Sequence, residues 1–414
     1  MRTIILGGGV VGVTTAYYLA KAGREVTVVD RHDGVAMETS FANAGLVAPG
    51  HSYTWASPKA PKILLKSLFV GGQALRLRLK PDPRMWRWCL QFLRNCTAER
   101  SRLNTSRKLR LCLYSQQLLQ QLTRTESLAY DQISAGLLYV YRDDASFARG
   151  RAAMTVLSDN GLRLQTLSPD EVVAREPALA PGKDGIAGAI FCPSDESGDA
   201  HAFTRQLAQR CEALGVKFEL GRTVQRLEFS ADRVSAALTD NGRLDGDEFV
   251  LALGCYAPQI ARPLGYRLPV YPVKGYSLTL PVSDGHAPPA LGGVDENNLV
   301  AWARFGNRLR FTATAEFAGY DTSHSPADFE HMMGVAKKLF PNGADYSRPQ
   351  YWACLRPMTP EGTPILGRTR HRNFYLNSGH GHMGWTMACG TARIVADVML
   401  GRSPEIDLEG MTLQ

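Results

Sequence analysis

Three glycines and one aspartate near the N-terminus have the residue types and spacing of a ligand-binding turn. Gly7, Gly9 and Gly12 form a GxGxxG motif, and Asp30 ends the later stretch EVTVVD. In such a motif the first glycine allows a tight turn, the second lets the backbone approach a pyrophosphate, and the third lets a helix pack closely on a strand. The aspartate can accept hydrogen bonds from a ribose, which disfavours the 2′-phosphate of NADP. The pattern predicts a site for an ADP-containing dinucleotide.

The surrounding residues predict the elements that would position this motif. Residues 3–6 are mostly apolar and β-prone, which indicates a short buried strand. A helix of apolar spacing follows and ends at Gly23, and a second strand over 25–29 leads to Asp30. The helix N-terminus offers unpaired N–H groups and a partial positive charge to a phosphate. Strand, helix, strand and acid occur in order, which favours a nucleotide site over a purely structural glycine turn.

A second glycine-rich turn lies near the C-terminus, in NSGHGHMGWTMACG. A strand leads into Gly379, Gly381 and Gly384, and a helix over about 386–400 follows. Two helix N-termini from opposite ends of the chain suit one long ligand. FAD has a pyrophosphate for the first turn and a redox-active ring for the second, where a helix dipole favours the anionic reduced ring. The second turn disfavours the alternative, an NAD-linked enzyme.

Composition limits the class of protein. The chain has 414 residues, 44% of them hydrophobic and 21% charged, which predicts an ordinary globular protein of two domains. There is no signal-peptide pattern and no run of eighteen apolar residues, so we expect a cytoplasmic protein. The eight cysteines form no CxxC pair, so we expect free thiols and no metal site.

The net charge of +8 comes largely from one segment, residues 59–110, where only Asp82 and Glu99 oppose the cations. Leucines and tryptophans are interleaved with the basic residues. This mixture on short helices is typical of a surface that lies on anionic lipid, and the alternative is a helical insertion with a solvated charged face. No nucleic-acid-binding motif accompanies the charge. The basic residues are Lys59, Lys62, Lys66, Arg76, Arg78, Lys80, Arg84, Arg87, Arg94, Arg100, Arg102, Arg107, Lys108 and Arg110.

The order of predicted elements indicates one domain interrupted by another. Dinucleotide-type elements lie at both ends and in the middle of the chain, and strand-rich sequence lies between them. We expect an α/β fold, α+β in part, with a Rossmann-like domain interleaved with a substrate domain on a largely antiparallel sheet. The predicted boundaries are 1–50, 150–262 and 350–414 for the first domain, and 51–149 and 263–349 for the second. Helices are expected from about Ala152 and over Pro326 to Leu339.

Five stretches of the chain closely resemble, in order, motifs of the FAD-dependent D-amino acid dehydrogenases, within the D-amino acid oxidase, glycine oxidase and sarcosine oxidase family. They are ILGGGVVGVTTAYYLAKAGREVTVVDR, ETSFANAG, YPVKGYSLTLP, LRPMTPEGTPILGRT and NSGHGHMGWTMACG. The resemblance implies non-covalent FAD and oxidation of an amino acid at Cα to an imine, which hydrolyses to a 2-oxo acid and ammonia. It also implies that electrons leave to a quinone or respiratory chain, which places the protein peripherally on the inner face of the cell membrane.

The resemblance also implies which residues bind FAD. Some contact its ADP part, others lie along its pyrophosphate and ring, and a last group meets the pyrimidine edge of the ring. The implied residues are Gly7, Gly9, Val10, Val11, Gly12, Asp30, Arg31, Ser40, Asn43, Ala44, Gly45, Val224, Gly254, Gly381, Gly384, Trp385 and Thr386.

An amino acid substrate needs a partner for its carboxylate, and a planar guanidinium matches a carboxylate better than an ammonium does. In related oxidases the arginine of LRP binds this group, which assigns the role to Arg356. Val300 stands where glycine oxidase has an assisting tyrosine, so Tyr53 is the candidate here, with His51 second. Lys274 and Tyr276 are further candidates for the other side of the ring.

Three alternatives remain open. The substrate could be a cyclic secondary amine such as D-proline or cis-4-hydroxy-D-proline, which would give a cyclic imine in place of ammonia. The chain could also be a non-catalytic FAD-bound scaffold. Cys354 occupies the position that carries covalent flavin in monomeric sarcosine oxidase, although a small buried thiol is the preferred interpretation.

Overall fold

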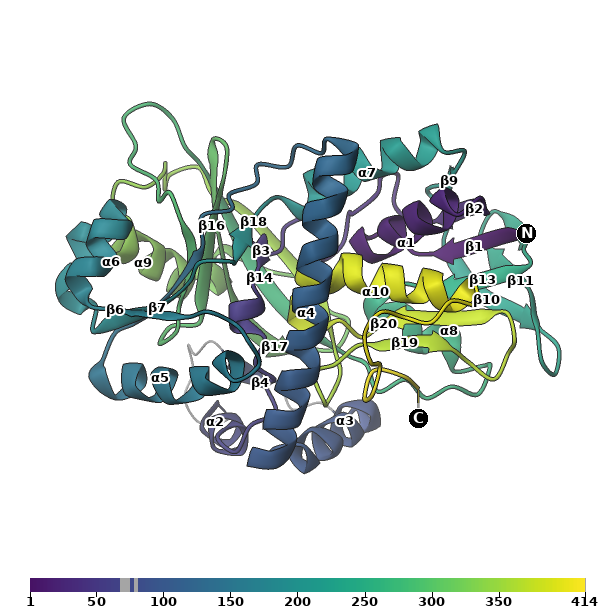
Figure 1. Cartoon of the computed structure of the whole chain (residues 1–414), viewed down its shortest axis with the longest axis horizontal. Helices are drawn as coiled ribbons and strands as arrows, with labels where there is room; N and C mark the ends of the chain where they lie inside the picture. Colours follow the sequence, from purple (N-terminus) through teal and green to yellow (C-terminus); the bar gives the residue numbers. More distant parts are fainter. Residues whose placement is uncertain (68–74, 78–80, 414) are drawn as a thin grey trace.

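The computed structural model of the chain describes residues 1–67, 75–77 and 81–413. Two large sheets lie side by side, and one long helix, α4 (Ala98–Glu126), runs across the front of the molecule between them (Figure 1). Of the basic segment named above, Arg78 and Lys80 lie outside the described residues. None of the helices in the described part of the chain is long and apolar enough to cross a membrane.

The first sheet has six strands within the described residues, in the order β19-β20-β13-β1-β2-β9. Neighbouring strands are parallel except for β19, which is antiparallel to β20. Segments from the start, the middle and the end of the chain therefore share this sheet. The strands are β1 (Arg2–Leu6), β2 (Glu25–Val29), β9 (Lys217–Glu219), β13 (Glu248–Leu251), β19 (Ile365–Arg368) and β20 (Phe374–Ser378).

Both faces of this sheet are covered, which explains why its central strands are almost continuously apolar. Ile5 and Val250 belong to the core shared with the helices, whereas Ile4 and Phe249 face a small antiparallel sheet. The helices on the first face are α1 (Val10–Lys21), α10 (Gly384–Met399), α4 and α7 (Ala200–Ala213). The opposite face carries β10 (Val224–Phe229), β11 (Val234–Thr239), β12 (Gly242–Asp245) and α8 (Ala257–Ala261).

The second sheet has nine strands within the described part of the chain, in the order β18-β14-β17-β16-β15-β5-β7-β6, with β4 paired to β17. Its pairs are antiparallel except for β15 with β5 and β17 with β4. The predicted fold class is thereby confirmed. The strands are β4 (Leu75–Leu77), β5 (Leu137–Tyr141), β6 (Gln165–Leu167), β7 (Gly188–Cys192), β14 (Tyr271–Pro281), β15 (Gly292–Asp295), β16 (Val300–Phe305), β17 (Arg308–Phe317) and β18 (Gln350–Met358).

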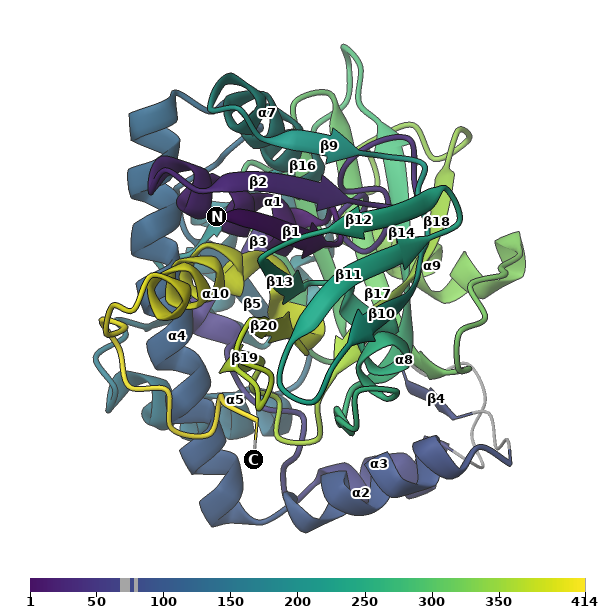
Figure 2. The same cartoon turned by 90° about the vertical axis from the view of Figure 1, so that its right-hand side faces the viewer.

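The shorter elements connect these layers. Two helices, α2 and α3, lie at the lower edge of the molecule in both views (Figures 1 and 2). A pair of short strands, β3 and β8, links the two halves near the sheet junction. These elements are α2 (Ala60–Ser67), α3 (Pro83–Arg94), α5 (Asp144–Ser158), α6 (Pro169–Arg175), α9 (Glu330–Leu339), β3 (Leu46–Val47) and β8 (Glu196–Ser197), with 3-10 turns at Pro49–His51, Pro177–Gly185, Gly254–Tyr256, Pro326–Phe329 and Gly381–Met383.

Two predicted helix boundaries differ from the structure. Helix α5 begins at Asp144 rather than near Ala152, because Asp143 accepts a hydrogen bond from the backbone N–H of Ser146 and caps the helix. The helix predicted from Pro326 begins as a 3-10 turn, and α9 follows it from Glu330. The predicted domain boundaries remain a prediction, but β6 and β7, within the range 150–262, belong to the nine-stranded sheet.

Candidate active site

One cavity of about 510 Å³ extends from the N-terminus of α1 to the N-terminus of α10. Its walls come from both large sheets and from the loop between β2 and β3. Most of the residues predicted to bind the cofactor line it. They are Gly7, Gly9, Val10, Val11, Asp30, Arg31, Ser40, Asn43, Ala44, Gly45, Val224, Gly254, Gly381, Gly384 and Trp385.

The glycines at the α1 end are required by close backbone contacts. Gly7 has a φ of +114°, and a Cβ on it would lie 2.5 Å from the carbonyl oxygen of Ala252. A Cβ on Gly12 would lie 1.9 Å from the carbonyl oxygen of Gly7, so Gly12 serves helix–strand packing and does not line the cavity. The roles predicted for these two glycines therefore agree with their surroundings.

Asp30 lies at the end of β2 beside the first glycine turn. Its carboxylate accepts hydrogen bonds from the backbone N–H groups of Gly8 (2.7 Å) and His32 (3.0 Å). The neighbouring Arg31 pairs with Glu38 and lies over the ring of Tyr256, with 4.2 Å between the guanidinium carbon and the ring centroid. The acid thus has the fixed position at the strand end that recognition of a ribose needs.

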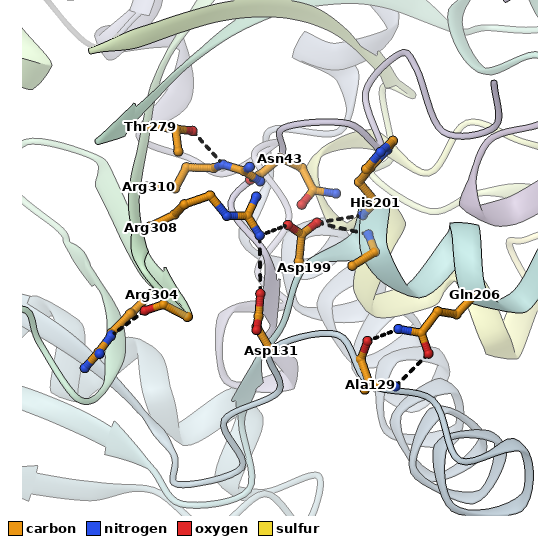
Figure 3. Close-up of polar contacts among 12 residues, drawn as sticks. Asn43, Ala129, Asp131, Asp199, His201, Gln206, Thr279, Arg304, Arg308 and Arg310 are labelled. Carbon is orange, nitrogen blue, oxygen red and sulfur yellow. Dashed lines mark hydrogen bonds and ion pairs between the residues drawn. The ribbon is translucent and has the colours of Figure 1, made fainter. Parts of the chain in front are cut away.

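The loop between β2 and β3 is held against the cavity from both sides. Ser40 accepts a hydrogen bond from the first N–H of α1, on Val10 (3.1 Å). From the nine-stranded sheet, Arg310 donates to the carbonyl of Asn43 (3.3 Å) and to the hydroxyl of Thr279 (3.0 Å), as Figure 3 shows. Burial lowers the pKa of Arg310 to about 10. Arg310 therefore connects the second sheet to the loop that lines the cavity.

At the α10 end, Thr386 does not line the cavity but fixes its wall. Its hydroxyl donates to the carbonyl of Leu46 (3.2 Å) and accepts from the N–H of Ala48 (3.1 Å). Two polar atoms of lining residues, Nε1 of Trp385 and Oδ1 of Asn377, are buried without a hydrogen-bond partner among the described residues. Buried polar groups normally form hydrogen bonds. These two unpaired atoms therefore fit a cavity that binds a ligand with polar groups, such as FAD.

Arg356 of β18 lines the cavity and has a distinctive environment. Its Nη1 donates to the carbonyl of Thr314 (2.7 Å), and no carboxylate among the described residues pairs with it. Gly275 lies beside it on β14, and a Cβ there would come within 2.4 Å of the guanidinium carbon. Burial lowers the pKa of Arg356, but an arginine keeps its charge at neutral pH. The cavity thus contains a cation with room for an external carboxylate.

His51 and Tyr276 also line the cavity. His51 Nε2 lies 3.0 Å from Oε1 of Glu296. Burial alone would lower the pKa of His51, but the charge and hydrogen bond of Glu296 outweigh this effect and raise it. The hydroxyl of Tyr276 donates to Glu316.

Two predicted substrate residues, Tyr53 and Lys274, are not among those that line the cavity. The ring of Tyr53 lies behind His51, with 6.2 Å between ring centroids. Lys274 is 1% exposed and donates to the carbonyl of Ser323, so it is neither at the cavity nor on the surface. The structure therefore does not bring either side chain together with Arg356.

The sequence interpretation missed several residues at this end. Lys108, placed with the surface cations, is 1% exposed and lies behind the cavity wall. His382, Trp55 and Gly275 line the cavity, and only the position of His382 in the turn HGHMGW gave a signal for its role.

The sulfur chemistry agrees with the expectation from the sequence. All eight cysteines are free, and Cys354 is a buried residue of the cavity wall, where burial raises the pKa of its thiol. A high pKa keeps a thiol protonated and unreactive at neutral pH. Within the described part of the chain, no group of His, Cys, Asp or Glu side chains could hold a metal ion.

Comparisons with known proteins agree with this geometry. The chain is 44% identical to D-amino acid dehydrogenase 2 of Mesorhizobium japonicum over 99% of each chain, and 45% identical to D-amino acid dehydrogenase of Paramagnetospirillum magneticum over 99% of this chain and 98% of the relative. Its fold is similar to that of glycine oxidase from Geobacillus kaustophilus (TM-score 0.76, 22% identity, 100% of this chain and 98% of the other) and of L-proline dehydrogenase from P. horikoshii (TM-score 0.75, 16% identity, 100% and 96%).

A family model described as FAD dependent oxidoreductase matches residues 2–398, which is nearly the whole chain. The motifs, the long cavity between two helix N-termini and this match point to the same conclusion. The chain belongs to the family of FAD-dependent oxidoreductases.

Proposed function

We propose that the protein oxidises D-amino acids at Cα, giving 2-oxo acids and ammonia. The observation that carries the proposal is Arg356, a half-buried cation on the cavity wall that has no carboxylate partner among the described residues. An amino acid supplies the missing carboxylate. Relatives of 44–45% identity over nearly the full chain carry the name D-amino acid dehydrogenase, which supports the D configuration.

The residues of this chain would prepare the amine for oxidation. Arg356 holds the carboxylate and so fixes Cα relative to the cavity wall. His51 lines the cavity, and Glu296 raises its pKa and so favours its protonated form. A positive charge at this position lowers the pKa of a substrate ammonium and so favours the neutral amine. FAD, when bound, would supply the hydride acceptor for the α-hydrogen of the neutral amine.

Anaerobic mixing of the purified holoenzyme with a panel of D- and L-amino acids tests this proposal. We expect D-amino acids, and not their L-enantiomers, to bleach the flavin absorbance and to release ammonia. Bleaching by D-proline alone, without ammonia, would favour a cyclic secondary amine as substrate. A flavin that no amine bleaches would favour a non-catalytic scaffold and would contradict the proposal.

Gly275 offers a specific test of the carboxylate site. A Gly275→Ala substitution places a Cβ within 2.4 Å of the Arg356 guanidinium, which is the movable end of a side chain, so the guanidinium shifts while the strand stays intact. We expect KM for a D-amino acid to rise about tenfold, because a misplaced bidentate contact costs about 1–2 kcal/mol, with little change in FAD content. Steady-state kinetics and flavin absorbance measure both. An unchanged KM would show that Arg356 does not hold the substrate.

We also infer that electrons pass to a quinone in a lipid bilayer, and that α3 faces this bilayer. Trp86, Leu90 and Leu93 recur at helical spacing and are 47%, 60% and 44% exposed. The opposite side of α3 packs into the protein through Trp88 and Phe92. Exposed arginines of α3 flank the apolar stripe, and this combination of charge and apolar surface matches anionic lipid.

Neutralising the α3 arginines tests this surface. The substitution Arg84→Gln/Arg87→Gln/Arg94→Gln is expected to weaken binding to phosphatidylcholine vesicles containing phosphatidylglycerol by about two orders of magnitude, measured by co-sedimentation, since each basic residue near an anionic surface contributes about 1 kcal/mol. The matched control, Lys217→Gln/Arg233→Gln/Arg372→Gln, removes three exposed charges that lie in β9, just before β11 and between β19 and β20. Equal sedimentation of the α3 variant and the parent would show that these charges are merely solvated.

A further inference from the structure

Lys108 is an unusual residue because it is a fully buried cation with no anionic partner among the described residues. It lies in the middle of α4 and is 1% exposed. Its Nζ donates to the carbonyl of Tyr53 (3.1 Å), and no carboxylate among the described residues forms an ion pair with it. Burial lowers the pKa of Lys108 to about 8, so it is still charged at neutral pH. Charged side chains are rarely buried unless they are paired, so the burial of Lys108 requires an explanation.

The neighbour of Lys108 on the cavity side is His382, which lines the cavity. Lys108 Nζ lies 3.5 Å from Nε2 of His382, and the imidazole stacks on Trp55, another lining residue, with 5.1 Å between ring centroids. An ammonium group can only donate hydrogen bonds, so Nε2 faces it with its lone pair. A neutral imidazole with a lone pair on Nε2 carries its hydrogen on Nδ1.

The surrounding charges keep His382 in this neutral form. Burial lowers its pKa most, and the positive charges of Lys108, His51 and Arg356 lower it further. No described residue accepts a hydrogen bond from Nδ1. The result is a fixed N–H donor at the same end of the cavity as Arg356, in a region of positive potential.

We propose that His382 is a second carboxylate-binding residue beside Arg356, donating from Nδ1 to the substrate carboxylate, and that Lys108 is the positioning residue that fixes this tautomer. This inference rests on the proposed function, because it assigns the donor to the carboxylate of the amino acid substrate. A carboxylate accepts several hydrogen bonds, so a second donor beside a guanidinium increases both affinity and orientation.

Propionate has the carboxylate of D-alanine but no amine, so its binding reports on this contact without turnover. Its dissociation constant is read from the change in flavin absorbance of the holoenzyme, and uncharged propanamide is the control ligand. In His382→Asn the amide nitrogen takes the place of Nδ1, whereas in His382→Gln it takes the place of Nε2. We expect the Asn variant to bind propionate within threefold of the parent and the Gln variant at least tenfold more weakly, with propanamide binding equal in both.

Lys108→Met tests the positioning role. In the parent this substitution removes the ammonium that fixes the tautomer of His382. We expect propionate binding to weaken about fivefold or more. In the His382→Asn background, where the donor no longer depends on a tautomer, the same substitution should change binding less than threefold. A merely structural role for Lys108 would produce equal losses in both backgrounds and would overturn the inference. Equal propionate binding by the Gln variant and the parent would also overturn it.

Different experimental results would contradict the proposed function and this inference. A flavin that no D-amino acid bleaches contradicts the proposed function. A flavin that D-alanine bleaches, in an enzyme whose propionate affinity does not respond to residues 108 and 382, contradicts the inference alone. Flavin absorbance gives the FAD content of each variant, and if His382→Gln loses FAD, the comparison of Lys108→Met in the two backgrounds decides the outcome.

Discussion

An Arg356→Leu variant is expected to lose at least two orders of magnitude in kcat/KM for a D-amino acid while it retains FAD. Leucine removes both the charge and the planar pair of donors that match a carboxylate. A charge-assisted bidentate contact in a buried site contributes about 3 kcal/mol or more, and each 1.36 kcal/mol is a factor of ten in rate. Steady-state kinetics with the best substrate of the panel gives the loss directly.

The Arg356→Lys variant is the matched control. It keeps one positive charge but lacks the guanidinium fork, so it should recover part of kcat/KM and remain about tenfold or more below the parent. The carbonyl of Thr314 keeps a donor in this variant, whereas the leucine leaves it without one. Flavin absorbance confirms that each variant holds FAD. If the leucine variant turned over substrate as well as the parent, the carboxylate would bind elsewhere and the proposed function would lose its main support.

The cofactor half of the cavity could be predicted from the sequence because local rules determine it. A tight turn, a close approach and a helix packed on a strand each require glycine at one position, and the contacts at Gly7 and Gly12 are of this kind. The turn at Gly381 and Gly384 follows the same logic at the other end of the cavity. The glycine spacing that marks these features lies within a few residues of the chain, so the sequence alone reveals it, although the backbone that requires Gly7 belongs to the distant Ala252.

The substrate half depends on contacts between distant residues, which spacing does not reveal. Gly275 makes room for Arg356 only because β14 pairs with β18 in one register. Lys108 stands among surface cations in the sequence, yet it follows the buried side of α4 and meets His382 from the far end of the chain. Lys274 is likewise buried by the packing of the nine-stranded sheet. Its neighbours in the sequence give no sign of this.

Sheet membership within the range 150–262 shows the same limit. Strands β6 and β7 are short, and their residues do not indicate which sheet they join. β7 pairs with β5 and β6 pairs with β7, which places both at one edge of the nine-stranded sheet. Sheet membership is set by pairing partners that are remote in sequence, so only the folded chain reveals it.

Lys108→Met is expected to stabilise the protein at neutral pH, in contrast to its effect on carboxylate binding. The pKa of Lys108 is lowered to about 8 in the folded protein from an ordinary value of 10.5. Between these values the unfolded chain binds more protons than the folded one, so the free energy of unfolding of the parent rises with pH over this window. Below about pH 8 the folded parent carries the full cost of the buried charge, at most about 3 kcal/mol. Methionine has a similar shape and no charge.

Urea unfolding of both FAD-saturated proteins at pH 7, 9 and 10.5 measures this difference. The free energy of unfolding of the methionine variant should exceed that of the parent by about 2–3 kcal/mol at pH 7. The difference should fall below about 0.5 kcal/mol at pH 10.5, where the folded lysine is neutral and about half of the unfolded lysine is. An advantage that did not change with pH would mean that packing and not charge separates the two proteins. A residue that lowers stability and strengthens ligand binding is typical of functional sites. The opposite signs of these two effects would therefore identify Lys108 as part of the substrate site rather than of the core.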